Sequence, residues 1–188
     1  MDEETKKILR QVCEDANLEI QRTGALRKSS VVEAQRISPS NNYGHSTALY
    51  FALPYILFDP INQFSAIFKN SGVIQLLCPL CLRDGSQIKL VDTLKWKNGN
   101  GNRMQPHLLH GVDSAILLVS KLYNCENGHR EVVACDSDIV KQIPDCLVRF
   151  VTSHISGVTK KFLFLFEQLL DKGMSFAGIE ELHKERYE

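Results

Sequence analysis

The stretch that decides the fold is HGVDSAILLVSKLYNCENGH, residues 110–129. Its central part, AILLVSKLY, is a run of apolar and β-branched residues that predicts a buried strand. The strand leads directly into CENGH, in which Cys125 and His129 flank the turn residues Asn127 and Gly128. Two potential metal ligands are therefore expected on a tight turn at the end of this strand.

A second pair of ligands lies 44 residues upstream, in the sequence CPLC at 78–81. A CxxC spacing places two sulfurs on one metal when the backbone turns tightly, and CENGH supplies the other two corners of a tetrahedron. Thiolate and imidazole ligands in a closed tetrahedron favour zinc over redox metals. We therefore predict one structural Zn²⁺ bound by Cys78, Cys81, Cys125 and His129, with Cys135 as the alternative fourth ligand.

Other interpretations of these cysteines fit the pattern less well. A thioredoxin-like CxxC needs a helix after the motif, whereas RDGS at 83–86 predicts a turn. Free cysteines often serve as small buried hydrophobes, but this would not explain why both pairs contain turn residues. His107 and His110, which flank two leucines on an expected strand, are predicted to be surface or edge residues.

Working outward from the metal ligands, the predicted fold class is α+β. Residues 1–22 carry apolar side chains at three- and four-residue steps and predict an amphipathic helix, followed by a polar linker to residue 45. Residues 46–135 predict a small antiparallel sheet like a zinc ribbon, with Asp59 capping a short helix inside it. Residues 136–188 predict a C-terminal helical bundle or hairpin, in which a helix over 158–172 ends at Gly173.

Composition and charge restrict the function. Apolar residues make up 44% and charged residues 23% of the chain, which is ordinary for a globular protein, and no apolar run reaches membrane-spanning length. With no secretory signal at its start, the chain is expected to be intracellular with reduced cysteines. Its 22 basic and 22 acidic residues give no net charge, so nucleic-acid binding would need a local patch. The candidate patch consists of Lys95, Trp96, Lys97 and Arg103; the alternative is a solvated hairpin whose Trp packs over the sheet.

Catalysis is not expected. The sequence contains no HExxH, P-loop or GxSxG motif, and CPLC lacks the upstream HxE of a zinc deaminase. A catalytic zinc would also need an open coordination position and a general base. A zinc-dependent hydrolase or deaminase remains the less favoured alternative, and no small-molecule substrate or membrane partner is evident.

The order of these motifs resembles a known family. LPYILFDPINQF, CPLC, a W-G-R-P stretch, HGVDSAILLVSKLYNCENGH and DSDIVKQIP are similar to a cysteine-cluster zinc-ribbon module. That module is found upstream of the catalytic domain in eukaryotic DDE transposases of the Kyakuja–Dileera–Zisupton type and in host proteins derived from them. The resemblance covers residues 46–188 and implies that Cys78, Cys81, Cys125 and a fourth Cys or His bind zinc.

The same resemblance implies a role and a place in the cell. This chain would be a non-catalytic accessory module of a transposase-derived protein in the nucleus, binding DNA or a nuclear protein partner. The alternative is a pure protein–protein interaction module without affinity for nucleic acid, which the absence of net charge favours. A catalytic DDE domain, if there is one, would lie outside this chain.

Overall fold

The fold is described from a computed structural model. It covers residues 3–26, 35–36, 54–64, 76–99, 104–112, 114–153, 156–178 and 181. Most of the predicted polar linker and most of the stretch after Phe176 fall outside these described residues.

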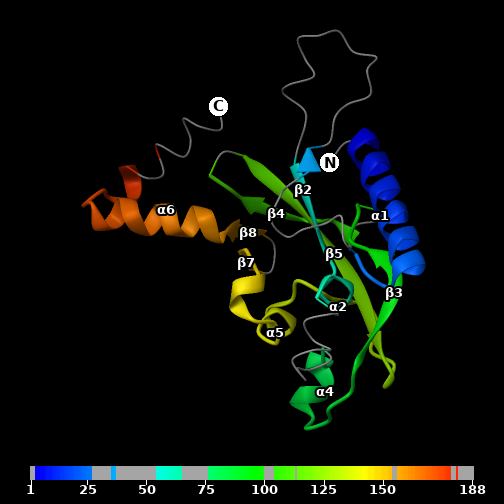
Figure 1. The fold of residues 1–188 in the computed structure, drawn as a ribbon. Coiled ribbons are helices and arrows are strands. Elements are labelled where there is room, and N and C mark those ends of the chain that lie inside the picture. Colours follow the sequence, from blue (N-terminus) through cyan, green and yellow to red (C-terminus); the bar gives the residue numbers. More distant parts are fainter. Residues whose placement is uncertain are drawn as a thin grey trace.

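A mixed sheet is built around one long central strand, β5 (Ala115–Cys125). The strand order through the main path is β1-β2-β5-β4-β8-β7, and two further strands, β3 and β6, pair with the C-terminal half of β5. The other strands are β1 (Gln35–Arg36), β2 (Pro54–Phe58), β3 (Leu90–Trp96), β4 (His107–His110), β6 (Val132–Val133), β7 (Phe150–Thr152) and β8 (Ser156–Thr159). Figure 1 shows β5 crossing the centre of the molecule.

The prediction of a purely antiparallel sheet is wrong. β2 pairs with β5 in parallel, and β4 pairs with β8 in parallel, whereas β3 and β6 pair with β5 antiparallel. The antiparallel pair β3–β5 leads to the metal ligands, and β1–β2, β4–β5 and β7–β8 are antiparallel as well. The parallel pairs arise from long chain connections, which the local sequence pattern does not reveal.

Two strands also occur where the sequence predicted only helices. β7 and β8 form an antiparallel pair, and β8 adds to the edge of β4. Gly157 allows this close packing, since a Cβ atom there would lie 2.5 Å from the Val151 carbonyl oxygen and 2.7 Å from a Leu109 methyl carbon. The short runs FVT and SGVT were too brief to stand out as strands.

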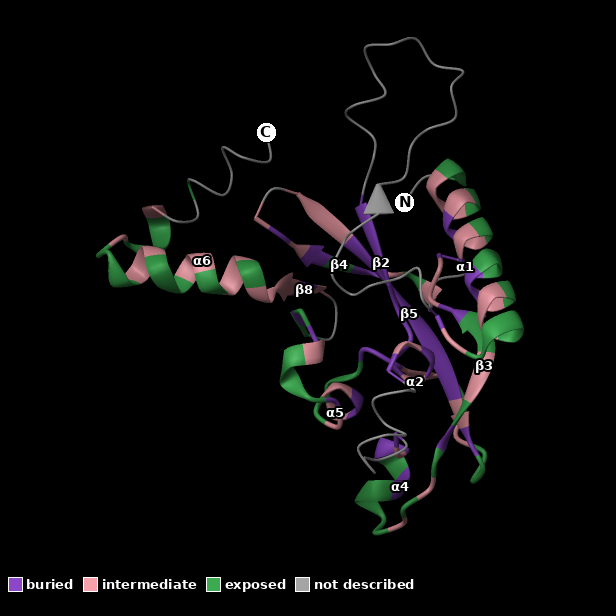
Figure 2. Cartoon of the chain, in the orientation of Figure 1, coloured by how far each residue is buried: buried purple, intermediate pink, exposed green. Residues whose placement is uncertain are grey.

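Two apolar clusters cover the opposite faces of the sheet. On β2, Tyr55 and Leu57 point to one face, and Ile56 and Phe58 point to the other. Helix α1 (Glu3–Thr23) packs on the first face through its buried residues Leu9, Cys13 and Ala16. This confirms the predicted amphipathic helix. Figure 2 shows β2 and most of β5 in the colour of buried residues.

The remaining helices are short except for the last. They are α2 (Pro60–Gln63), α4 (Pro79–Arg83), α5 (Ser137–Val140), the 3-10 turn η2 (Asp145–Leu147) and α6 (Lys160–Asp171). Asp59 caps α2, as predicted, and Asp136 caps α5. Gly173, with φ of +82°, follows the end of α6, also as predicted.

Helix α6 departs from expectation in its packing. A helix of the predicted C-terminal bundle or hairpin would bury its apolar side chains, but no residue of α6 is buried. Phe164 is 61% exposed, and Figure 1 shows the helix projecting away from the sheet. A C-terminal bundle is not seen among the described residues. No helix in the described ranges has the length and apolarity required to cross a bilayer.

Candidate metal centre

The first ligand pair lies where the chain turns before β3. Cys78 has an extended backbone, and Pro79 begins the five-residue helix α4, which carries Cys81 one turn later. The amide of Cys78 donates to the Ile88 carbonyl at 2.8 Å, and the amide of Ser86 donates to the Cys81 carbonyl at 2.8 Å. These bonds tie both ends of the turn together and place the two sulfurs on the same side.

The second pair lies on the turn that ends β5. The amide of Cys125 donates to the His129 carbonyl at 2.9 Å, and the amide of Gly128 donates back to the Cys125 carbonyl at 3.0 Å. Gly128 has a φ of +83°, a conformation that residues with a Cβ adopt only at a cost. The glycine therefore permits the turn that brings His129 back beside Cys125.

The sheet brings the two pairs together. Leu90, the first residue of β3, lies opposite Cys125 on β5, and Leu77 forms an isolated bridge with Lys89. Each turn therefore leaves the sheet at the same place, although the two lie 44 positions apart in sequence. Figure 1 shows α4 at the end of the sheet where β3 begins and β5 finishes.

The four predicted ligands form one compact group. The Nδ1 atom of His129 lies 3.5 Å from the Sγ of Cys78, 3.4 Å from that of Cys81 and 3.3 Å from that of Cys125. The Sγ atoms of Cys81 and Cys125 are 3.9 Å apart, and all four ligand atoms lie within 4.8 Å of one another. The group can hold one metal ion.

The surroundings of the sulfurs influence their ionisation. Burial raises the pKa of Cys125, but hydrogen bonds from the backbone of His129 and the side chain of Cys78 outweigh it and lower the pKa to about 7. Burial and the neighbouring sulfurs of Cys78 and Cys125 raise the pKa of Cys81 to about 11. The Asn127 amide also donates to the Cys81 sulfur at 3.5 Å, as an outer hydrogen bond to a ligand does in many metal sites.

Cys135, the alternative fourth ligand, does not belong to this group. It is buried in the same apolar cluster as the three ligand cysteines, but its Sγ lies 3.5 Å from the Nδ1 of His107. His107 itself is only 9% exposed, so the prediction that it lies at the surface is wrong. It shares the inward-facing side of β4 with the buried Leu109, which explains its burial.

The residues of the predicted nucleic-acid patch differ in how far they are exposed. Lys95 is exposed and lies 3.7 Å from Glu131, and Lys97 is partly buried. Trp96 is only 2% exposed and packs in the cluster beneath α1, so it is not available to stack on a base. Arg103 lies outside the described residues. Burial of Trp96 agrees with the alternative interpretation, in which the ring packs over the sheet.

A buried polar cluster on β5 was missed by sequence analysis. We call it the Lys121 network; its members are Lys121, Asp59, Asp92, Asn17, Asn62, Tyr123 and Trp96. Lys121 and Asp59 are both fully buried, with Nζ and Oδ2 3.6 Å apart, and Lys121 lies 3.3 Å from Asp92. The only hint in the sequence is a lysine within the apolar run AILLVSKLY.

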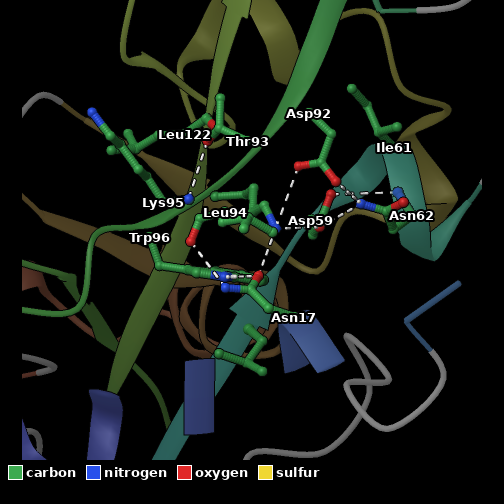
Figure 3. Close-up of polar contacts among 12 residues, drawn as sticks. Asn17, Asp59, Ile61, Asn62, Asp92, Thr93, Leu94, Lys95, Trp96 and Leu122 are labelled. Atoms are coloured by element: carbon green, nitrogen blue, oxygen red, sulfur yellow. Dashed lines mark hydrogen bonds and ion pairs between the residues drawn. The ribbon is translucent and has the colours of Figure 1, made fainter. Parts of the chain in front are cut away.

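The other members of the Lys121 network hold its charges in place. Asp59 accepts hydrogen bonds from the Tyr123 hydroxyl at 2.7 Å and the Asn62 amide at 2.8 Å. Asn17 of α1 accepts from the Trp96 indole at 2.9 Å and from Lys121 at 3.0 Å. Figure 3 shows Asn17 beneath Trp96 and Asp59 beside Asn62. The network therefore links α1 to β3 and β5.

Comparison with the known protein families, with curated proteins and with solved structures found no significant match. The resemblance to the transposase-associated module thus rests on its motifs alone. What the structure adds is the grouping of three cysteines and one histidine.

Proposed function

We propose that this chain is a non-catalytic module that binds one structural zinc ion and serves as a binding surface for another macromolecule. The grouping of Cys78, Cys81, Cys125 and His129 carries this proposal. Zinc bound tetrahedrally at about 2.3 Å from sulfur and 2.0–2.1 Å from nitrogen separates sulfur from nitrogen by about 3.6 Å and two sulfurs by about 3.8 Å. Here the three sulfur–nitrogen separations are 3.3–3.5 Å, and the sulfurs of Cys81 and Cys125 are 3.9 Å apart.

A structural role fits better than a catalytic one. Four protein ligands complete a tetrahedron and leave no position for a reactive water. Helix α4 contributes only Pro79 and Cys81 as buried residues, so apolar packing adds little to the strand pairing that brings the two ligand-bearing turns together. Zinc would join them and so replace part of an apolar core.

The surface favours a protein partner over DNA. Net charge is zero, Lys95 is beside Glu131, and Trp96 is buried. Helix α6 instead presents Phe164, which is 61% exposed, with Phe162 and Phe166 half-buried on the same helix, and many protein-binding surfaces carry exposed aromatic side chains of this kind. The motif resemblance supports a nuclear, transposase-derived protein as the setting, in which a DNA-binding role is the second candidate.

Metal content tests the zinc proposal directly. Native mass spectrometry of the purified chain should find one zinc ion, and Cys81→Ser should lose it. Cys146→Ser is the matched control, because Cys146 is exposed and outside the ligand group. Cys135→Ser should retain zinc and His129→Ala should not. Metal retained by His129→Ala but lost from Cys135→Ser would contradict the proposed ligand set.

Titration with a mixed-sequence DNA duplex separates the two kinds of partner. If the module binds protein, fluorescence anisotropy should show negligible binding even at low salt. Binding through phosphate contacts would instead fall steeply with salt and would weaken in Lys95→Glu and Lys97→Glu variants. That result would replace the protein partner with DNA while leaving the zinc proposal intact.

A further inference from the structure

One cysteine and one histidine outside the metal site, Cys135 and His107, lie together at a cavity. The cavity, of about 340 Å³, is lined by Lys97, His107, Val133, Cys135, Asp136, Ser137, Thr152 and Ser153. Cys135 and His107 are buried, whereas Asp136, Ser137 and Ser153 are exposed. The thiol and the imidazole thus lie on its inner wall, and the exposed residues form its rim.

Cys135 is held in place from both sides. Its amide donates to the Ser120 hydroxyl at 3.0 Å, and its carbonyl accepts from the Thr152 hydroxyl at 3.0 Å. Its Sγ lies 3.5 Å from the His107 Nδ1, within the range for a hydrogen bond to sulfur. When the thiol donates this bond, Nδ1 is the acceptor and can take the proton. A cysteine and a neighbouring base in this relation form the usual arrangement of an activated thiol.

We propose that Cys135 and His107 form a nucleophilic thiol site that accepts a short acyl group from a small activated ester. A cavity of this size is near the lower end of the range of small-molecule sites, about 300–1,000 Å³. This inference does not depend on the metal centre, since neither residue belongs to the ligand group.

The proposed step is a simple acyl transfer. His107 Nδ1 takes the proton of the Cys135 thiol as the sulfur lone pair forms a bond to the acyl carbon. The bond from that carbon to the ester oxygen breaks, its electron pair leaves with the oxygen, and the oxygen receives the proton from His107. The products are a thioester on Cys135 and a free alcohol, so no oxidant or reductant is required.

The electrostatic surroundings make His107 necessary at neutral pH. Burial raises the pKa of Cys135, while the Ser120 hydroxyl and the positive charge of Lys97 partly offset this and Asp136 adds to it. The thiol is therefore protonated at neutral pH and needs a base to react. At high pH the thiol ionises without help, so the need for His107 should disappear.

Acetylation by p-nitrophenyl acetate tests the site in the metal-loaded chain. The wild-type chain should release one equivalent of nitrophenolate in a rapid phase, and peptide mass mapping should find the acetyl group on Cys135. Cys146→Ser, which removes the exposed cysteine, should behave as wild type. His107→Gln should slow the reaction about 100-fold at pH 7 and recover at high pH.

Each other result would overturn the proposal. Acetylation of Cys146 or a lysine in place of Cys135 would show that the cavity thiol is not reactive. A His107→Gln variant with the wild-type rate and pH profile would show that the imidazole is not the base. Cys135→Ala should abolish the rapid phase; if that variant fails to fold, mapping of the wild-type chain decides the question.

Discussion

The metal centre and the Lys121 network both depend on β5, but they stabilise the fold in different ways. At the end of the strand, Cys125 and His129 come from one turn and Cys78 and Cys81 from another, so each pair is fixed by local backbone geometry. In the middle of the strand, Lys121 meets side chains from α1, from β3 and from the residue before α2. A metal joins two preformed turns, whereas the network needs the whole sheet assembled first.

The largest loss of folding stability should follow removal of the metal. Removing zinc with a strong chelator leaves all four ligand groups close together without the ion that joins them, and Cys81→Ser leaves three of them. Because binding free energy at such a site is folding free energy, we expect destabilisation on the order of 5–10 kcal/mol. Thermal unfolding followed by circular dichroism should show the loss.

A matched control separates the metal from the cysteine. Cys146→Ser should have the same melting temperature as the wild-type chain, both in the presence and in the absence of the chelator. An unchanged melting temperature for Cys81→Ser would mean that the turns are held together by packing, and the contrast with the Lys121 network would then disappear.

The second-largest loss of folding stability should follow substitution of Lys121. Lys121→Met leaves Asp59 fully buried without its cation, and breaking one partner of a buried pair costs about 3–5 kcal/mol. Urea denaturation should measure the change. Lys95→Met is the control, because Lys95 is a neighbouring lysine on β3 that is 64% exposed and should change stability by less than about 1 kcal/mol.

A second substitution sharpens the test. If the cost arises from the unpaired Asp59, then adding Asp59→Asn to Lys121→Met should recover much of the lost stability. Additive losses in the double variant would show instead that Lys121 acts mainly through its contact with the Trp96 ring, 4.5 Å from its Nζ.

A smaller loss of folding stability is expected from substitution of Asn17, which connects α1 to the Lys121 network. Asn17→Ala removes the acceptor shared by the Trp96 indole and Lys121, leaving a buried donor unsatisfied at a cost of about 1–3 kcal/mol. Gln11→Ala is the control, since its contact with Asp15 is exposed and lies within the helix. Equal stability of both variants in urea would mean that α1 is held by its apolar face alone.

The sequence was informative where a feature depends on neighbouring residues. The ligand group was predictable, because CPLC and CENGH each carry their spacing and turn residues locally, and Asp59 was recognisable as a helix cap. The parallel pairing of β2 with β5 was not predictable, since it depends on how a long connection crosses the sheet.

The same distinction explains what was missed. The Lys121 network joins residues from positions 17 to 123, and apart from the bond between Asp59 and Asn62 its contacts connect residues far apart in sequence. Likewise Cys135 and His107 lie 28 positions apart and meet only because β4 pairs with β5. Polar groups that depend on tertiary contacts leave little trace in a local pattern.

The smallest predicted effect concerns pH and acts only on the metal centre. Metal binding requires thiolates, so affinity must rise with pH as protons are released. With the pKa of Cys125 at about 7 and that of Cys81 at about 11, Cys125 is largely ionised above pH 7 and protonated below it. A competition titration with a zinc chelator should therefore show that the affinity for zinc falls more steeply below pH 7. The extra slope is about 1.4 kcal/mol of binding free energy per pH unit, because Cys125 must then release one more proton when zinc binds. The same slope on both sides of pH 7 would mean that the backbone of the CENGH turn does not favour the Cys125 thiolate before the metal binds.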